Sequence, residues 1–88
     1  MLRLPAELTH GQARACLTEL ARAIDQEQTS VVVDAAALQR FDSSALAVLL
    51  ELRRMCLSRG KQLDVQGWPR HLADLATLYG IDSLLRTA

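Results

Sequence analysis

The chain has 88 residues, of which 50% are hydrophobic and only 3% are aromatic. A chain of this length forms one domain, here residues 1–88, and its core must be built from aliphatic side chains. Ten lysine and arginine residues balance ten aspartate and glutamate residues, so the formal net charge is zero. This balance argues against a nucleic-acid-binding protein and against a polybasic membrane surface, because both need a basic excess.

The two cysteines, Cys16 and Cys56, lie within apolar helical patterns, which predicts buried free thiols. The sequence contains no Cys-x-x-Cys motif, glycine-rich phosphate loop or metal-ligand spacing, so we expect no metal and no cofactor. Pro5 and Glu7 fall where a signal peptide needs an apolar run, and no apolar run is long enough to span a bilayer. We therefore expect a cytoplasmic protein.

The first elements are a short strand and a helix. Residues 2–4 alternate between apolar and polar until Pro5 interrupts them, which predicts an edge strand. Thr9 has a side chain suited to cap a helix, and the helix is predicted to run to about Glu27. Its core-facing stripe, at helical spacing, is Ala13, Leu17, Leu20, Ala21 and Ile24.

The middle of the chain, residues 29–67, has the pattern of a strand, then of a helix, then of a second strand. Residues 29–35 contain three consecutive valines, which favour a strand that is covered on both faces. A helix is then predicted over residues 43–59, with Gly60 as the residue that follows its end. Residues 61–67 alternate again, which predicts a third strand.

The last predicted helix begins at Pro69 and ends at Gly80. Its apolar stripe is Leu72, Leu75, Ala76 and Tyr79. Residues 81–88 form a tail that we expect to dock on the body through Ile81, Leu84 and Leu85. The element order is thus β-α-β-α-β-α, which is typical of an α/β protein with an open sheet and helices packed on it.

The 43–59 helix carries apolar residues on two sides. At about 100° per residue, one side has ordinary core spacing: Ala45, Val48, Leu49, Leu52 and Cys56. The opposite side contains Ser43, Ala47, Leu50, Arg54 and Leu57, with Leu46 at its flank and Arg53 at its border. This second side is either an ordinary exposed surface, a surface that the tail covers, or a partner-binding surface.

Ser43 allows two interpretations. A serine at a helix start can cap unsatisfied backbone N–H groups. Alternatively, its hydroxyl is a modification site, because a phosphate there would meet the positive end of the helix dipole. Such a phosphate would add about two negative charges at the edge of the leucines and weaken an apolar contact.

The segment VVVDAAALQRFDSSALAVLLELRR resembles the STAS domain of anti-sigma-factor antagonists. In that family the phosphorylatable hydroxyl residue follows an aspartate, as Ser43 follows Asp42 here, and Asp34 matches a recurring acidic position. The segment GKQLDVQGWPRHLADLATLYGIDSLLR is similar to the small STAS subunit of Mla-type phospholipid ABC transporters, the MlaB family. The resemblance covers residues 1–88 and implies a STAS-like, open, mixed β-sheet with helices packed on it.

The resemblance also implies a function. The MlaB family provides a non-enzymatic accessory subunit that binds the cytoplasmic ATPase of the transporter and supports its assembly and activity. The protein would then lie at the inner face of the membrane through its partner. Carried over to this sequence, the residues expected to face the ATPase are Ser43, Ala47, Leu50 and Arg54, bordered by Leu46, Arg53 and Leu57.

Two alternative functions, and one expectation about self-association, remain at this point. The same family includes switch proteins that bind an anti-sigma kinase and are phosphorylated, here on Ser43. An enzyme would have to use His10, His71, Asp34, Asp42 or Ser43, but neither histidine neighbours a nucleophile in the sequence. Finally, an exposed leucine surface predicts a weak homodimer when the partner is absent.

Overall fold

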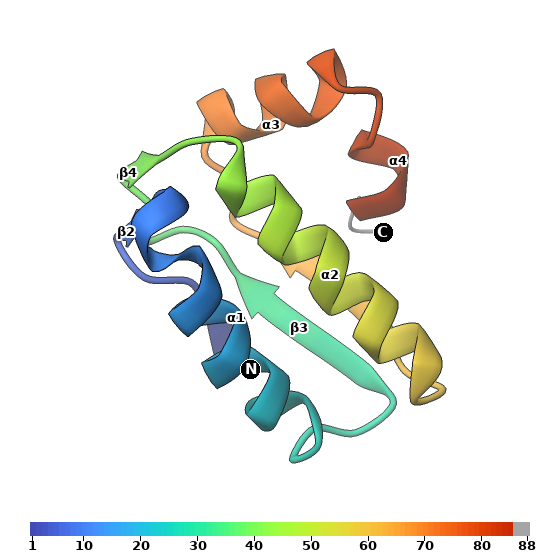
Figure 1. The fold of residues 1–88 in the computed structure, drawn as a ribbon. Coiled ribbons are helices and arrows are strands. Elements are labelled where there is room, and N and C mark those ends of the chain that lie inside the picture. Colours follow the sequence, from blue (N-terminus) through green and yellow to red (C-terminus); the bar gives the residue numbers. More distant parts are fainter. Residues whose placement is uncertain (86–88) are drawn as a thin grey trace.

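A computed structural model describes residues 1–85 of the chain, apart from the side chain of Asp82 (Figure 1). The predicted alternation of strands and helices is confirmed, with two short strands and one short helix added. The last three residues of the predicted tail, 86–88, lie outside the described residues. The elements are β1 (Leu2–Arg3), β2 (Glu7–Leu8), α1 (His10–Ile24), β3 (Ser30–Asp34), β4 (Arg40–Phe41), α2 (Ser44–Ser58), β5 (Gln62–Gln66), α3 (Arg70–Leu78) and α4 (Asp82–Leu85).

The main sheet has the strand order β1-β3-β5, and β2 pairs with β4 in a separate two-stranded ribbon. Val31 lies opposite Leu63 and Val33 lies opposite Val65 in the register of β3 and β5. Every strand pair among the described residues is parallel. The expectation of a mixed sheet, with parallel and antiparallel pairs, is therefore wrong. The reason is that a helix returns the chain to the same end of the sheet before each new long strand begins.

Helices α1 and α2 lie side by side over one face of the sheet (Figure 1). Val31, Val33 and Val65 point to that face and are fully buried. Val32, on the other face, is only half-buried, so the expectation that β3 is covered on both faces is wrong. The connections β1–α1–β3 and β3–α2–β5 both move across the sheet in the same direction. Right-handed connections of this kind place α1 and α2 on the same face.

The core between the helices and the sheet is aliphatic, as the composition predicts. Cys16 and Cys56 are buried free thiols, and burial raises the pKa of both, which keeps them protonated and unreactive. The tail docks in part: Leu85 is buried in the core and Ile81 packs against it. Leu84 is 45% exposed, because the short helix α4 turns only one of its leucines inward.

Candidate partner-binding surface

The first turn of α2 is fixed by Asp42 rather than by Ser43. Oδ1 of Asp42 accepts the backbone N–H of Ser44 at 2.8 Å. Ser43 already has helical backbone angles, and its side chain makes no capping hydrogen bond. The interpretation of Ser43 as a side-chain cap is therefore wrong, because the preceding aspartate satisfies the free N–H group. The Ser43 hydroxyl lies exposed at the start of the helix.

Asp42 also reaches the neighbouring helix. Its Oδ2 accepts the backbone N–H of His10, the first residue of α1, at 3.1 Å. The N–H of Ser44, followed by that of His10, lowers the pKa of the Asp42 carboxyl, although partial desolvation opposes the shift. The ionised carboxylate thus lies at the N-terminal ends of two helices, where the helix dipoles favour negative charge.

The outward side of α2 forms one continuous surface, which we call the outer stripe: Ser43, Ala47, Leu50, Arg54 and Leu57. Four of the five residues are exposed, and Leu50 is half-buried because it packs partly against the core. Leu57 keeps 51% of its surface exposed. Ala45, Val48, Leu49, Leu52 and Cys56 are all buried on the opposite side, as predicted. The structure therefore brings the predicted stripe together on one face.

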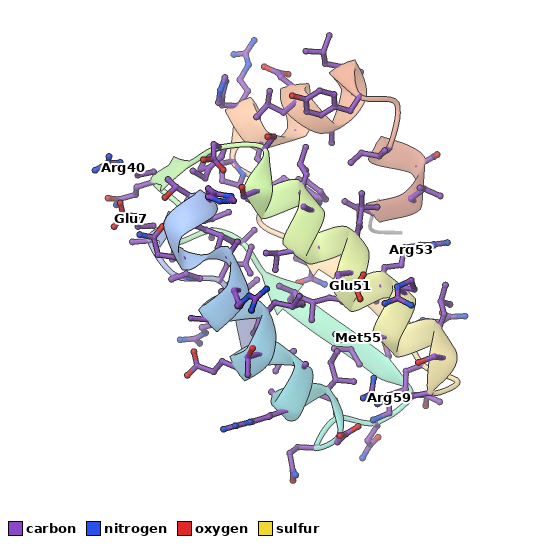
Figure 2. The ribbon with its side chains drawn as sticks, in the orientation of Figure 1. Glu7, Arg40, Glu51, Arg53, Met55 and Arg59 are labelled. Carbon is purple, nitrogen blue, oxygen red and sulfur yellow. The ribbon has the colours of Figure 1, made fainter. Side chains whose placement is uncertain are left out.

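Charged side chains border the outer stripe on both sides. Nε of Arg54 donates to Oε2 of Glu51 at 3.0 Å, and a second, shorter contact joins Nη2 to Oε1. This pairing lowers the pKa of Glu51 and raises that of Arg54, so both stay charged. In Figure 2, Arg53 extends from the side of α2 that faces α4, whereas Met55 lies on the side that faces α1.

Leu46 does not belong to this surface. The sequence places it at the flank of the outward side, but its side chain is only 2% exposed. Helix α2 contacts α4 as well as α1, so its buried arc is wider than a single apolar stripe. Leu46 falls within that wider arc, and we remove it from the predicted partner-binding residues.

The family model described as "Mlab, STAS domain" matches residues 1–86. The chain belongs to the MlaB-like STAS family. This confirms the resemblance and the α/β fold class. STAS domains are generally interaction or regulatory domains rather than enzymes. No curated protein matches the sequence.

In this STAS domain, Asp34 at the end of β3 has a local structural role. Oδ1 of Asp34 accepts the N–H of Ala36 at 2.9 Å, which forms a tight turn after the strand. Gly67, after β5, packs directly against this turn with a φ of +69°. Asp34 therefore shapes the loops at the carboxyl ends of the two strands.

The STAS domain exposes a second group of apolar side chains that sequence reasoning missed. Leu78 is 76% exposed and Tyr79 is 55% exposed, at the end of α3. Tyr79 was expected in the core-facing stripe, but it is exposed as the residue that ends α3, although its N–H still donates to the carbonyl of Leu75. The turn at Gly80, with a φ of +71°, ends the helix where the sequence predicts it.

Both histidines lie near the start of α2, because the backbone N–H of His10 donates to Asp42, which precedes Ser43. His71 packs against the ring of Phe41, with ring centroids 5.8 Å apart. Within residues 1–85, no group of three or more histidine, cysteine or acidic side chains could hold a metal ion. None of the described helices is long and apolar enough to cross a membrane.

Proposed function

We propose that this STAS domain is a non-enzymatic accessory subunit that binds the cytoplasmic ATPase of an Mla-type phospholipid ABC transporter. The observation that carries the proposal is the two-sided packing of α2. Six of its side chains fill the core, while the outer stripe on the opposite side stays open. The protein would reach the inner face of the membrane through this partner.

The composition of the outer stripe supports a protein partner. Leu50 and Leu57 supply apolar area, and arginines at the border match the usual composition of interface residues. Burial of a leucine releases about 25 cal/mol for each Å² removed from water. Small side chains at Ser43 and Ala47 let a partner approach the first two turns of α2 closely.

A second candidate function is an anti-sigma-factor antagonist that binds an anti-sigma kinase through the same stripe. The observation that favours it is the state of Ser43, whose hydroxyl is exposed and holds no capping bond. A phosphate on Ser43 would lie beside the Asp42 carboxylate and at one end of the outer stripe. The added charge would weaken the partner contact.

The test is affinity purification of the tagged chain from its own cells, with mass spectrometry of the proteins that co-purify. Two variants accompany the wild type. Leu57→Asp changes the outer stripe, and Leu78→Asp makes the same change at an exposed leucine in the last turn of α3. An acid in the last turn opposes the helix dipole in both variants, so they are matched for this effect.

We expect the wild type and Leu78→Asp to retain an ABC ATPase together with its permease, and Leu57→Asp to lose both. A co-purifying anti-sigma kinase, with Ser43 phosphorylated, would establish the second function and overturn the first. If Leu78→Asp loses the ATPase and Leu57→Asp retains it, the ATPase contact lies at the end of α3 and not on the outer stripe.

A further inference from the structure

Lys61 is the only lysine in the sequence, whereas arginine occurs nine times. It lies between α2 and β5, and its side chain reaches the C-terminal end of α1. Its Nζ donates to the carbonyl oxygens of Ile24 at 2.7 Å and Glu27 at 2.8 Å. Its backbone N–H donates to the carbonyl of Cys56 at 2.8 Å, near the end of α2. One residue therefore supplies donors to the C-terminal ends of both helices.

A nearby arginine binds a different group at the same end of α1. Nε of Arg59 lies 2.9 Å from Oδ1 of Asp25. A planar guanidinium suits a carboxylate, whereas an ammonium is a compact charge whose N–H groups can point to separate acceptors. The carbonyls of Ile24 and Glu27 both lie within 2.8 Å of a single nitrogen atom. The arrangement of these acceptors therefore favours a lysine and not an arginine.

We infer that the C-terminal end of α1 is a binding site for one primary ammonium group, which Lys61 fills, and that acylation of Lys61 opens this contact. We call the contact the Lys61 clasp. The end of a helix presents carbonyls without intrahelical donors and carries the negative end of the helix dipole. The Lys61 side chain is half-buried, so water and salt screen this attraction less than they screen a surface ion pair. An acylated Nζ has no charge and keeps one N–H, so it cannot serve both carbonyls.

Acylation would act on the clasp selectively, because no other side chain in residues 1–88 carries a primary amine. The ammonium form has no lone pair, so the clasp must open and Nζ must lose a proton to solvent before it reacts. The neutral nitrogen then attacks the acyl carbon of a thioester. A nitrogen–carbon bond forms, the carbon–sulfur bond breaks, and the thiol leaves with the proton that the nitrogen releases. The product keeps the clasp open.

The first experiment measures how well the clasp protects its amine. The folded chain is treated with acetic anhydride, and mass spectrometry follows acetylation of the Lys61 side chain with time. Arg14→Lys, at an exposed position on α1, places a second amine in the same molecule as a control. We expect Lys61 to react at least about tenfold more slowly than the control amine in the folded chain, and equally fast in urea. Equal rates in the folded chain would overturn the clasp.

The second experiment tests what acylation does to the domain. N-acetyllysine is introduced at position 61, and at position 14 in a control protein. Acylation at position 61 should lower the melting temperature by about 5 °C or more, because two charge-assisted hydrogen bonds are lost. Hydrogen exchange should speed up at the amides of Gln26 and Glu27, which bond to carbonyls at the end of α1. An unchanged melting temperature and unchanged exchange at these amides would show that acylation does not open this end of α1.

The third experiment tests the preference for an ammonium. Lys61→Ala removes the part of the side chain that n-propylammonium reproduces, so n-propylammonium chloride should raise the melting temperature of Lys61→Ala more than that of the wild type. Tetramethylammonium chloride carries the same charge without an N–H group and should not favour Lys61→Ala. Lys61→Arg keeps the charge and should still melt below the wild type. If Lys61→Arg melts with the wild type, or if both salts act alike on Lys61→Ala, the site has no preference for an ammonium and the inference fails.

Discussion

The carboxylate of Asp42 accepts the backbone N–H of His10 at 3.1 Å, although 32 positions separate these residues in the sequence. The other carboxylate oxygen accepts the N–H of Ser44 at 2.8 Å. One side chain therefore joins the first turn of α1 to the first turn of α2. Because the outer stripe begins at the next residue, this joint sets the position of the stripe relative to the rest of the domain.

The opposite ends of the two helices are joined as well. Nζ of Lys61 donates to the carbonyl oxygens of Ile24 at 2.7 Å and Glu27 at 2.8 Å, just after α2. Arg59 also pairs with Asp25 at 2.9 Å. Positive groups thus meet the C-terminal end of α1 and a negative group meets its N-terminal end, as the helix dipole favours. Hydrogen bonds and an ion pair therefore hold α1 and α2 together at both ends, beneath the outer stripe.

The first prediction concerns the joint at Asp42. Asp42→Ala should lower the melting temperature by a few degrees, because it leaves the N–H groups of His10 and Ser44 without their acceptor. Asp74→Ala, at an exposed position on α3, serves as the control. Hydrogen exchange should also speed up at the amide of His10 in Asp42→Ala. Unchanged exchange at that amide would show that the joint does not hold α1.

The pH dependence of stability follows from the same carboxyl. Hydrogen bonds lower the pKa of Asp42 in the folded protein, chiefly that from Ser44 N–H. A lowered pKa contributes stability that is complete above the unfolded value, about 3.9, and is lost as the pH falls through the folded value. The difference in unfolding free energy between wild type and Asp42→Ala should therefore be constant above about pH 5 and shrink below about pH 4.

Urea denaturation at a series of pH values measures this difference. Glu51 also has a lowered pKa, because of Arg54, but it is present in both proteins and its effect cancels. A difference that stays constant down to the lowest pH at which the wild type folds would contradict the assignment of the shift to Asp42.

Much of the fold could be predicted from spacing and turn chemistry. The valine-rich strand, the core side of α2 and the place of Thr9 directly before α1 each depend on neighbouring residues, which a sequence displays directly. Thr9 indeed pairs with Gln12, whose Oε1 accepts both the Thr9 N–H at 2.9 Å and its hydroxyl at 2.6 Å. The outer stripe was predictable for the same reason, since a helix wheel uses only local spacing.

The misses arise where distant segments meet. The pairing of β2 with β4 involves two residues on each strand, too few for any periodicity to appear. The burial of Leu46 depends on how closely α2 packs with both α1 and α4, which its own helix spacing cannot show. The choice of Asp42 rather than Ser43 as the capping side chain is a local miss, because aspartate and serine are both good capping residues and stand side by side.

The next prediction separates the two interpretations of Ser43 by stability. A serine that caps a helix through its side chain costs about 1 kcal/mol when it is replaced by alanine. Because the Ser43 side chain makes no capping bond, Ser43→Ala should change the unfolding free energy by less than about 0.5 kcal/mol. Chemical denaturation measures the change, with Thr9→Ala as the comparison that removes a bonded hydroxyl. A loss as large as that of Thr9→Ala would restore the capping role.

The last prediction concerns the contact between Gly67 and the turn at Asp34. A Cβ added at Gly67 would lie 2.7 Å from Oδ1 of Asp34 and 3.1 Å from the backbone nitrogen of Ala36. Gly67 also has a φ of +69°, a conformation that costs a non-glycine residue about 1 kcal/mol or more. Gly67→Ala should therefore destabilise the domain by about 3 kcal/mol, because strain and steric overlap add.

Gly60 provides the matched control, since it has a φ of +70° and an added Cβ would meet no atom within 4 Å. Gly60→Ala should lose only the conformational part, about 1 kcal/mol. Urea denaturation of both variants gives the difference between them, which isolates the steric contact with Asp34 and Ala36. If the two substitutions destabilise the domain equally, the turn after β3 gives way to the new methyl group, and Asp34 does not hold it rigidly.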